Sequence, residues 1–330
     1  MASDLAAPRA RTPLTRRPWW RAAKRTATLL FFALVAWLLF TQARSIEWGK
    51  VLASIRAYPP HLLLISAGMA MTSYALYSSF DLVSRHYSGH TLSTRKVLLA
   101  TFISYAFNLN FGSLIGGLGF RLRLYSQLGL GPEVISRIYG FTMLTNWSGY
   151  VVLAGVLCLL QPIELPPQWA LGGTALRVIG AVLLGLAASY LALCGLSRKR
   201  SWTVHGQELS LPSLRVAALQ LPLACVTWMA IAGVIYPLLQ HRTGYPTVLA
   251  VLLLAAVAGV VTHVPAGLGV IEAVFVALLS PQIAKNELLA ALLLFRAVYY
   301  LMPLALATVL YLLFEMNVKK PPDRQADDTG

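Results

Sequence analysis

The sequence predicts an all-α polytopic membrane protein with six full spans and two oppositely oriented re-entrant hairpins, arranged like an inverted repeat. Three observations predict this fold. Of the 330 residues, 57% are hydrophobic and 12% are charged, whereas about a quarter of the residues of a soluble domain are charged. Apolar runs of membrane-spanning length recur along the chain, and two shorter runs end in glycine-rich breaks.

Eight apolar segments follow one another. A helix needs about 20 apolar residues to cross about 30 Å of hydrocarbon. The third and the seventh segments are shorter than the long spans, so each is expected to enter the membrane and return. The segments cover residues 26–42, 60–81, 97–112, 138–160, 174–196, 216–239, 247–263 and 287–314.

The two short segments end in similar breaks. Each break contains Gly-Leu-Gly, at residues 117–119 and 267–269, and each precedes a second, shorter helical stretch. The shared context predicts an internal repeat with halves at about residues 60–160 and 174–315. The break residues are Gly116, Gly117 and Gly119 in the first half, and Pro265, Gly267 and Gly269 in the second.

Basic residues decide between two membrane topologies. If all eight segments crossed, the Arg-Lys-Arg cluster at residues 198–200 would lie outside, and residues 161–173, which lack Lys and Arg, would lie inside. Two re-entrant segments reverse both placements, which agrees better with the positive-inside rule. The first hairpin then enters from the cytoplasm and the second from the periplasm, with both termini cytoplasmic.

Three regions follow from this topology. Residues 1–25 form a basic cytoplasmic leader, and residues 26–315 form a single transmembrane domain. Residues 316–330 are polar and contain two prolines, so we expect a disordered cytoplasmic tail.

The composition also argues against several functions. The net charge of +15 is explained by cytoplasmic loops, so no nucleic-acid partner is expected. Cys158, Cys194 and Cys225 lack CxxC spacing, and Gly89 separates His86 from His90 in a loop, so no metal site is expected. Phosphate-loop, dinucleotide and HExxH motifs are absent. We therefore expect no cofactor and no enzymatic activity.

Polar residues inside apolar runs are the candidates for a functional site. Arg296 lies deep in a long apolar segment, and we expect it to pair with Glu272 and to line a polar cavity; a purely structural salt bridge is the alternative. Arg121 and Arg123 follow the first break, where they would attract head-group phosphates or mark the cytoplasmic interface. Asn108, Asn146 and His263 complete the candidates for contact with a lipid head group or a polar cavity, and Asp81 and Asn110 are further polar residues within apolar runs.

Five stretches carry a family resemblance: YSSFDLVSRHYSGH, SYAFNLNFGSLIGGLGFRLRLYSQLGL, TNWSGY, HVPAGLGVIEAVFVALL and FRAVYYLMPL. They resemble the YbhN family of bacterial inner-membrane proteins, which is similar to the flippase half of the MprF lysylphosphatidylglycerol synthases. The resemblance covers about residues 20–315, and its link to MprF rests mainly on PAGLGVIEA and FRAVYYLMP.

The resemblance implies a domain of the bacterial inner membrane that moves or presents phospholipids, with anionic lipids favoured. It also suggests a partner in envelope lipid transport or a cardiolipin synthase. The sequence departs from full-length MprF because it lacks the cytosolic aminoacyl-transferase domain, so we do not expect it to make lysyl-lipid. The matching motif residues are Gly116, Gly117, Gly119, Arg121, Pro265, Gly267, Gly269, Glu272 and Arg296.

Three functional hypotheses remain at this point. The leading one is a flippase-like or scramblase-like protein that acts in phospholipid translocation or envelope lipid homeostasis. The second is a non-transporting membrane partner of a periplasmic lipid-transfer protein or a phospholipid synthase. The third is a membrane-embedded enzyme that acts on a lipid phosphate.

Overall fold

The computed structural model describes residues 58–160, 172–197, 201–204, 207–262, 264 and 267–317, together with isolated residues between 26 and 56. The chain divides into two compact units, Met1–Lys50 and Val51–Gly330. In the first unit the isolated described residues are helical. The predicted leader, most of the first predicted span and nearly all of the predicted tail lie outside the described residues.

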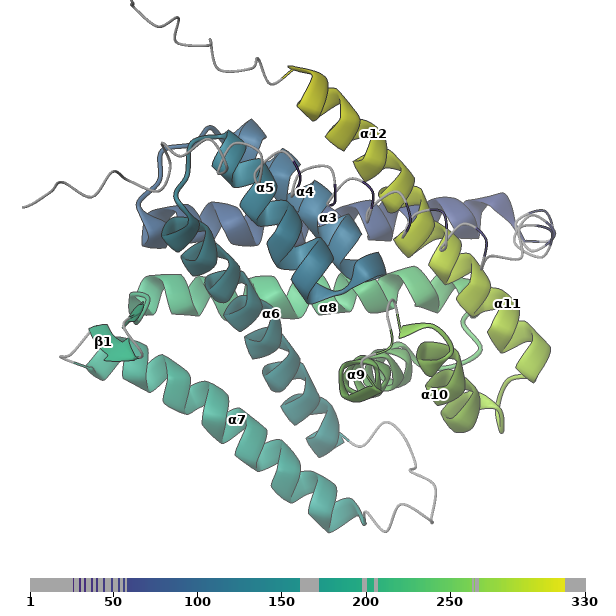
Figure 1. Cartoon of the computed structure of the whole chain (residues 1–330). Coiled ribbons are helices and arrows are strands. Elements are labelled where there is room, and N and C mark those ends of the chain that lie inside the picture. Colours follow the sequence, from purple (N-terminus) through teal and green to yellow (C-terminus); the bar gives the residue numbers. More distant parts are fainter. Residues whose placement is uncertain are drawn as a thin grey trace, which may run out of the picture. The chain divides into compact units, whose positions relative to one another are not determined.

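The second unit is mainly helical (Figure 1). Its long helices lie over the predicted apolar segments, although α3 ends seven residues after the predicted segment 60–81 and α6 begins six residues before 138–160. Two segments have π-helical geometry, η2 (Ser113–Gly119) and η5 (Arg296–Leu301). The α-helices are α3 (Pro60–Ser88), α4 (Thr94–Phe111), α5 (Phe120–Gln127), α6 (Pro132–Leu160), α7 (Gly173–Leu196), α8 (Leu214–Leu238), α9 (Tyr245–Thr262), α10 (Val270–Leu279), α11 (Lys285–Phe295) and α12 (Met302–Asn317).

A short hairpin interrupts the helical pattern between α7 and α8. Strand β1 (Ser201–Val204) pairs antiparallel with β2 (Gln207–Ser210). The predicted all-α chain did not include this hairpin, which is small and lies between two apolar helices.

Six helices in the described part of the chain are long and apolar enough to cross a membrane. The number agrees with the prediction, but the set differs. Helix α9, which we expected to be re-entrant, is among the six, while the predicted span at residues 26–42 falls largely outside the described residues. The re-entrant course of the two short segments stays a prediction. The six ranges are Pro60–Arg85, Pro132–Leu160, Gly173–Leu196, Leu214–Leu238, Tyr245–Thr262 and Lys285–Met316.

Each predicted break reverses the chain into a helical hairpin. Helix α4 ends at Gly112, whose φ of 84° suits glycine, and η2 and α5 then pack back along α4. The ring of Phe107 on α4 stacks on Phe120 at the start of α5, with centroids 3.9 Å apart. In the second half, α10 likewise packs back on α9 (Figure 1).

Helices α3 and α8 form the centre of the unit and lie side by side (Figure 1). Ser66 on α3 donates a hydrogen bond of 3.0 Å to the carbonyl of Val234 on α8. The side chain of Met69 packs close to Gly233, with its sulfur 3.2 Å from the position that a Cβ would take. The two halves of the predicted repeat therefore meet along α3, the first long helix of the first half, and α8, the second long helix of the second half.

Small residues allow α6 to approach α7 and α8 closely. A Cβ added to Gly149 on α6 would lie 2.4 Å from the Cβ of Ala224 on α8. A Cβ added to Gly180 on α7 would lie 2.7 Å from the carbonyl oxygen of Gly155 on α6. Contacts of this kind are typical of helices that associate in a membrane.

The outward face of α7 is apolar. Its side chains at Val178, Val182, Leu186 and Leu193 are all more than half exposed. Only 11% of the most apolar 18 residues of α7 are buried within the protein. A continuous apolar face of this size is unfavourable in water and favourable against lipid. It therefore agrees with a membrane-spanning position for α7.

Candidate functional site

The close packing of the first hairpin requires glycine at position 116 and leaves little room at position 117. A Cβ on Gly116 would lie 2.1 Å from the carbonyl oxygen of Phe107, so η2 approaches the backbone of α4 too closely for any side chain. A Cβ on Gly117 would lie 2.8 Å from the Oδ1 atom of Asn108, a candidate residue whose Oδ1 is buried and unpaired within the described chain. Gly119 has an ordinary helical φ of −60°. The close approach brings α5 and its arginines against α3 and α4.

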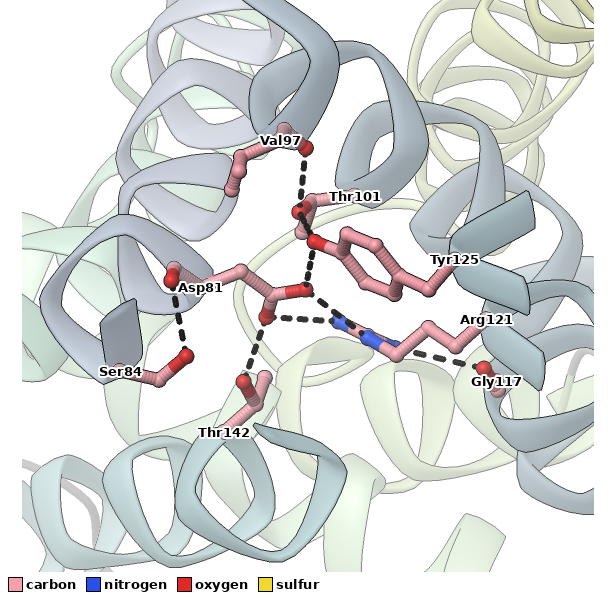
Figure 2. A network of polar contacts seen from close by, with 8 residues as sticks. All are labelled: Asp81, Ser84, Val97, Thr101, Gly117, Arg121, Tyr125 and Thr142. Carbon is pink, nitrogen blue, oxygen red and sulfur yellow. Dashed lines mark hydrogen bonds and ion pairs between the residues drawn. The ribbon is translucent and has the colours of Figure 1, made fainter. Parts of the chain in front are cut away.

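Asp81 and Arg121 form a buried ion pair beside the start of α5 (Figure 2). The Nε atom of Arg121 donates to Oδ2 of Asp81 at 3.1 Å, and Nη2 donates to Oδ1 at 3.2 Å. Both side chains are 0% exposed. The pair connects α3 with α5, which are separated in sequence by the whole of α4 and η2.

Two hydroxyl groups complete the coordination of the Asp81 carboxylate (Figure 2). Tyr125 donates to Oδ2 at 2.9 Å, and Thr142 on α6 donates to Oδ1 at 2.6 Å. The hydroxyl of Tyr125 also lies 3.2 Å from that of Thr101 on α4. Helices α3, α4, α5 and α6 thus converge on one carboxylate, and we call this group of residues the Asp81 network.

The Asp81 network changes the interpretation of Arg121. We expected Arg121 to attract a head group or to mark the membrane interface, but its guanidinium is fully buried and its charge is neutralised by Asp81. The remaining terminal nitrogen, Nη1, donates to the carbonyl of Gly117 at 3.4 Å. In this conformation Arg121 therefore holds the hairpin in place and does not face lipid or water.

Glu272 and Arg296 form the second ion pair, as we expected. Nε of Arg296 hydrogen-bonds to Oε1 of Glu272, and Nη2 donates to Oε2 at 2.9 Å. Nη2 also donates to the carbonyl of Gly267 at 2.9 Å, and the guanidinium carbon lies 5.6 Å from the centroid of the Tyr300 ring. We call Glu272 and Arg296 the Glu272–Arg296 pair.

The second break positions this pair. Gly267 and Gly269 have φ values of 55° and 77°, in the left-handed region that favours glycine, and Gly269 caps the start of α10. Glu272 lies in the first turn of α10, where the helix dipole favours a negative charge. The Arg296 and Glu272 side chains remain 13% and 21% exposed, so other molecules have some access to them.

A cluster of tyrosines links η5, which begins at Arg296, to the first half of the chain. The hydroxyl of Tyr299 lies 2.8 Å from that of Tyr105 on α4 and 3.2 Å from that of Ser73 on α3. Tyr74 on α3 donates to the carbonyl of Tyr299 at 3.1 Å. Asn110 on α4 donates to the carbonyl of Tyr300 at 3.4 Å. Because π-helical segments are frequent at functional sites, η5 is a candidate for part of the site.

The other candidate residues are dispersed. Arg123 pairs with Glu315 at 2.7 Å and also donates to the Tyr311 hydroxyl at 2.7 Å, which joins α5 to α12. The carbonyl of Asn146 accepts a hydrogen bond of 3.0 Å from Trp228. His263 and Pro265 lie outside the described residues.

Sequence reasoning noted Asp81 but missed its role as the partner of Arg121. The available signal was its position at the end of the second apolar segment, because a carboxylate in such a place needs a counter-charge. The tyrosine cluster gave no such signal, since aromatic residues in apolar helices most often serve packing.

Comparison with known proteins agrees with this architecture. The family described as "Lysylphosphatidylglycerol synthase TM region" matches residues 27–307. "Inner membrane protein YbhN" of Escherichia coli is 44% identical over 304 residues, which cover 92% of this chain and 96% of the relative. An uncharacterized protein of Synechocystis is 30% identical over 281 residues, covering 84% and 87% of the two chains. The resemblance to the YbhN family is thereby confirmed.

More distant relatives are longer proteins. "Phosphatidylglycerol lysyltransferase" of Staphylococcus haemolyticus is 24% identical over 301 residues. The match covers 86% of this chain but only 33% of that protein. The shared part therefore corresponds to a minority of the lysyltransferase chain.

Proposed function

The chain is a membrane protein of the lysylphosphatidylglycerol synthase TM-region family, and we propose that it moves phospholipids across the bacterial inner membrane as a flippase-like or scramblase-like protein. Both termini would lie in the cytoplasm. The observation that carries the proposal is the Glu272–Arg296 pair, a partly exposed ion pair among apolar helices.

A phosphate group can replace the carboxylate in this pair. Arginine presents a planar set of donors that binds a carboxylate or a phosphate through two parallel hydrogen bonds. Arg296 already uses two nitrogens on Glu272 and keeps a backbone acceptor at Gly267. An anionic head group would take the place of Glu272 on Arg296, while the acyl chains would stay in lipid.

The two hairpins supply the framework for this exchange. In each, the short arm after the glycine break carries one member of an ion pair, Arg121 in the first and Glu272 in the second. We propose that the hairpins are re-entrant, enter from opposite faces and form an inverted repeat. The buried Asp81 network would keep the first hairpin fixed, and the more accessible Glu272–Arg296 pair would contact the head group.

Anionic lipids are the proposed cargo. The more distant relatives are named for phosphatidylglycerol, an anionic phospholipid, and Arg296 suits an anionic group. We assign lipid handling, and no aminoacyl transfer, to the region that matches the family.

Reconstitution tests the proposal. The purified protein is placed in liposomes that contain a labelled phospholipid, and a membrane-impermeant reductant bleaches the label that reaches the outer leaflet. We expect bleaching of inner-leaflet label to be faster than in empty liposomes, and faster for anionic than for zwitterionic lipids. A variant with Glu133→Gln and Arg137→Gln, two exposed residues on α6, is the charge-matched control for a variant with Glu272→Gln and Arg296→Gln.

Rates equal to those of empty liposomes for every lipid would contradict transport. Stable co-purification with a periplasmic lipid-transfer protein or a phospholipid synthase would then favour the non-transporting alternative.

A further inference from the structure

A small cavity lies outside both ion-pair sites, where the end of α8 meets the start of α11. Its volume is about 210 Å³. Polar side chains on its wall include Tyr58, Gln240, Arg242, Asn286 and Glu287, and leucine and isoleucine side chains supply an apolar part. Glu287 and Arg296 lie nine residues apart on one continuous helical stretch, so roughly 14 Å of helix axis separates the two residues.

The backbone beside this cavity has an unusual conformation. Gln240 and His241 have φ values of 50° and 58°, and they are the non-glycine residues with positive φ in the described part of the chain. Strain of this kind tends to occur at binding and switch sites. Here the turn is stabilised by hydrogen bonds from the amides of Gln240 and Arg242 to the carbonyls of Pro237 and Leu239, at 2.9 and 3.1 Å. It brings Arg242 to the wall of the cavity.

The cavity presents one positive and one negative charge. Arg242 donates to Glu287 at 2.5 Å, and the two side chains are 49% and 40% exposed. The hydroxyl of Tyr58 donates a hydrogen bond of 2.9 Å to the carbonyl of Leu238. Burial raises the pKa of Tyr58, and the negative charge of Glu287 raises it further. Solvent-exposed ion pairs contribute little net free energy, so a ligand can replace this one far more easily than the buried Asp81–Arg121 pair.

The two charges and the size of the cavity indicate the kind of ligand that fits. A purely anionic ligand on Arg242 would leave Glu287 without a positive partner, and a purely cationic ligand on Glu287 would leave Arg242 without a negative one. A ligand with both charges can satisfy both residues, and the cavity is smaller than the 300–1,000 Å³ typical of drug-sized ligands. We propose that this cavity binds a phosphoryl-ammonium zwitterion, the head group of phosphatidylethanolamine, with its phosphate on Arg242 and its ammonium on Glu287.

This site goes beyond the proposed transport of anionic lipids. By the predicted topology it opens toward the periplasm, and binding there does not depend on translocation. The same head-group chemistry occurs in a membrane lipid and in its soluble glycerol ester, so both sources are tested.

Calorimetric titration of the purified protein in detergent tests the site. The ligands are glycerophosphoethanolamine, glycerophosphate and ethanolamine, which present both charges, the negative charge and the positive charge respectively. We expect glycerophosphoethanolamine to bind at least about tenfold more tightly than either single-charge ligand. Native mass spectrometry in nanodiscs that contain phosphatidylethanolamine and phosphatidylglycerol is the arm for the lipid source. Retention of phosphatidylethanolamine there assigns the site to lipid, and binding of the soluble ester alone assigns it to the free head group.

Two variants separate the roles of the charges. Glu287→Gln should remove the preference over glycerophosphate, and Arg242→Gln should remove the preference over ethanolamine. The Glu133→Gln, Arg137→Gln control should keep both preferences. Equal binding of the three ligands, or preferences unchanged in both cavity variants, would overturn the proposal. Neither result bears on the liposome assay, so failure of this site is distinct from failure of the transport proposal.

Discussion

Arg296 binds Glu272 through two guanidinium nitrogens while both side chains keep part of their surface exposed, 13% and 21% respectively. Arg121 binds Asp81 with the same two nitrogens, but both side chains are 0% exposed. A fully buried pair is costly to separate, because each charge would remain without a partner in a medium of low dielectric constant. The two pairs therefore suit different roles: the buried pair fixes the first hairpin, and the partly exposed pair is the one for which we propose head-group binding.

Asp81→Asn should destabilise the protein strongly. The substitution leaves the charge of Arg121 buried and unpaired, for which the expected cost is about 3–5 kcal/mol of unfolding free energy. Denaturant titration in detergent micelles measures the change. The double variant Asp81→Leu, Arg121→Met removes both charges and should lose less stability than Asp81→Asn alone. Unfolding of Asp81→Asn at the wild-type denaturant concentration would contradict this account of the network.

Gly116→Ala should prevent the first hairpin from packing. The new Cβ would lie 2.1 Å from the Phe107 carbonyl oxygen, and the backbone of α4 cannot move aside without disturbing its helix. We expect a loss above the roughly 1–3 kcal/mol of ordinary overpacking, seen as aggregation in size-exclusion chromatography. Gly140→Ala on α6 is the control, since nothing lies within 4 Å of its Cβ position. Similar elution of the two variants would refute the close approach.

Tyr299→Phe should weaken the connection between η5 and the first half. The hydroxyl of Tyr299 lies within hydrogen-bond distance of Tyr105 and Ser73, and its removal leaves buried polar groups without a partner. The expected loss is about 1–3 kcal/mol of unfolding free energy. A double-mutant cycle with Tyr105→Phe measures the coupling, because residues in contact give non-additive losses. Additive losses would show that the two hydroxyls act independently.

The predicted topology has a direct chemical test. In a background with Cys158, Cys194 and Cys225 replaced, a cysteine introduced by Ser201→Cys should react with a reagent applied from the cytoplasm. A cysteine introduced by Gln168→Cys should react from the periplasm. The reverse pattern would rule out two re-entrant segments, because it is the pattern that eight full crossings produce.

Much of the helical architecture was predictable from sequence. Helices α7 to α9 begin and end within two residues of the expected segments, because long apolar runs can satisfy their backbone groups in lipid only as helices. The β1–β2 hairpin was not predictable, since a short polar stretch between two spans carries no strong periodic signal. The same holds for the π-helical geometry of η2 and η5, which depends on tertiary contacts.

The candidate site was predictable in part. Glu272 was a plausible partner for Arg296, since each ionisable residue in an apolar region needs a partner and the second break brings the two close. The pairing of Asp81 with Arg121 depends on the way α4 and α5 fold back against α3, which the sequence does not specify. From sequence alone, Arg121 therefore has the features of a residue at the membrane interface.

The transport rate of an Arg296 variant tests the central claim most directly. In liposomes with labelled anionic phospholipid, Arg296→Gln should reduce bleaching of inner-leaflet label to the rate of empty liposomes. The double variant Glu272→Gln, Arg296→Gln removes both charges, so it should fold with stability close to that of the wild type and still fail to transport. Wild-type rates in the folded double variant would contradict a role for the Glu272–Arg296 pair in head-group binding.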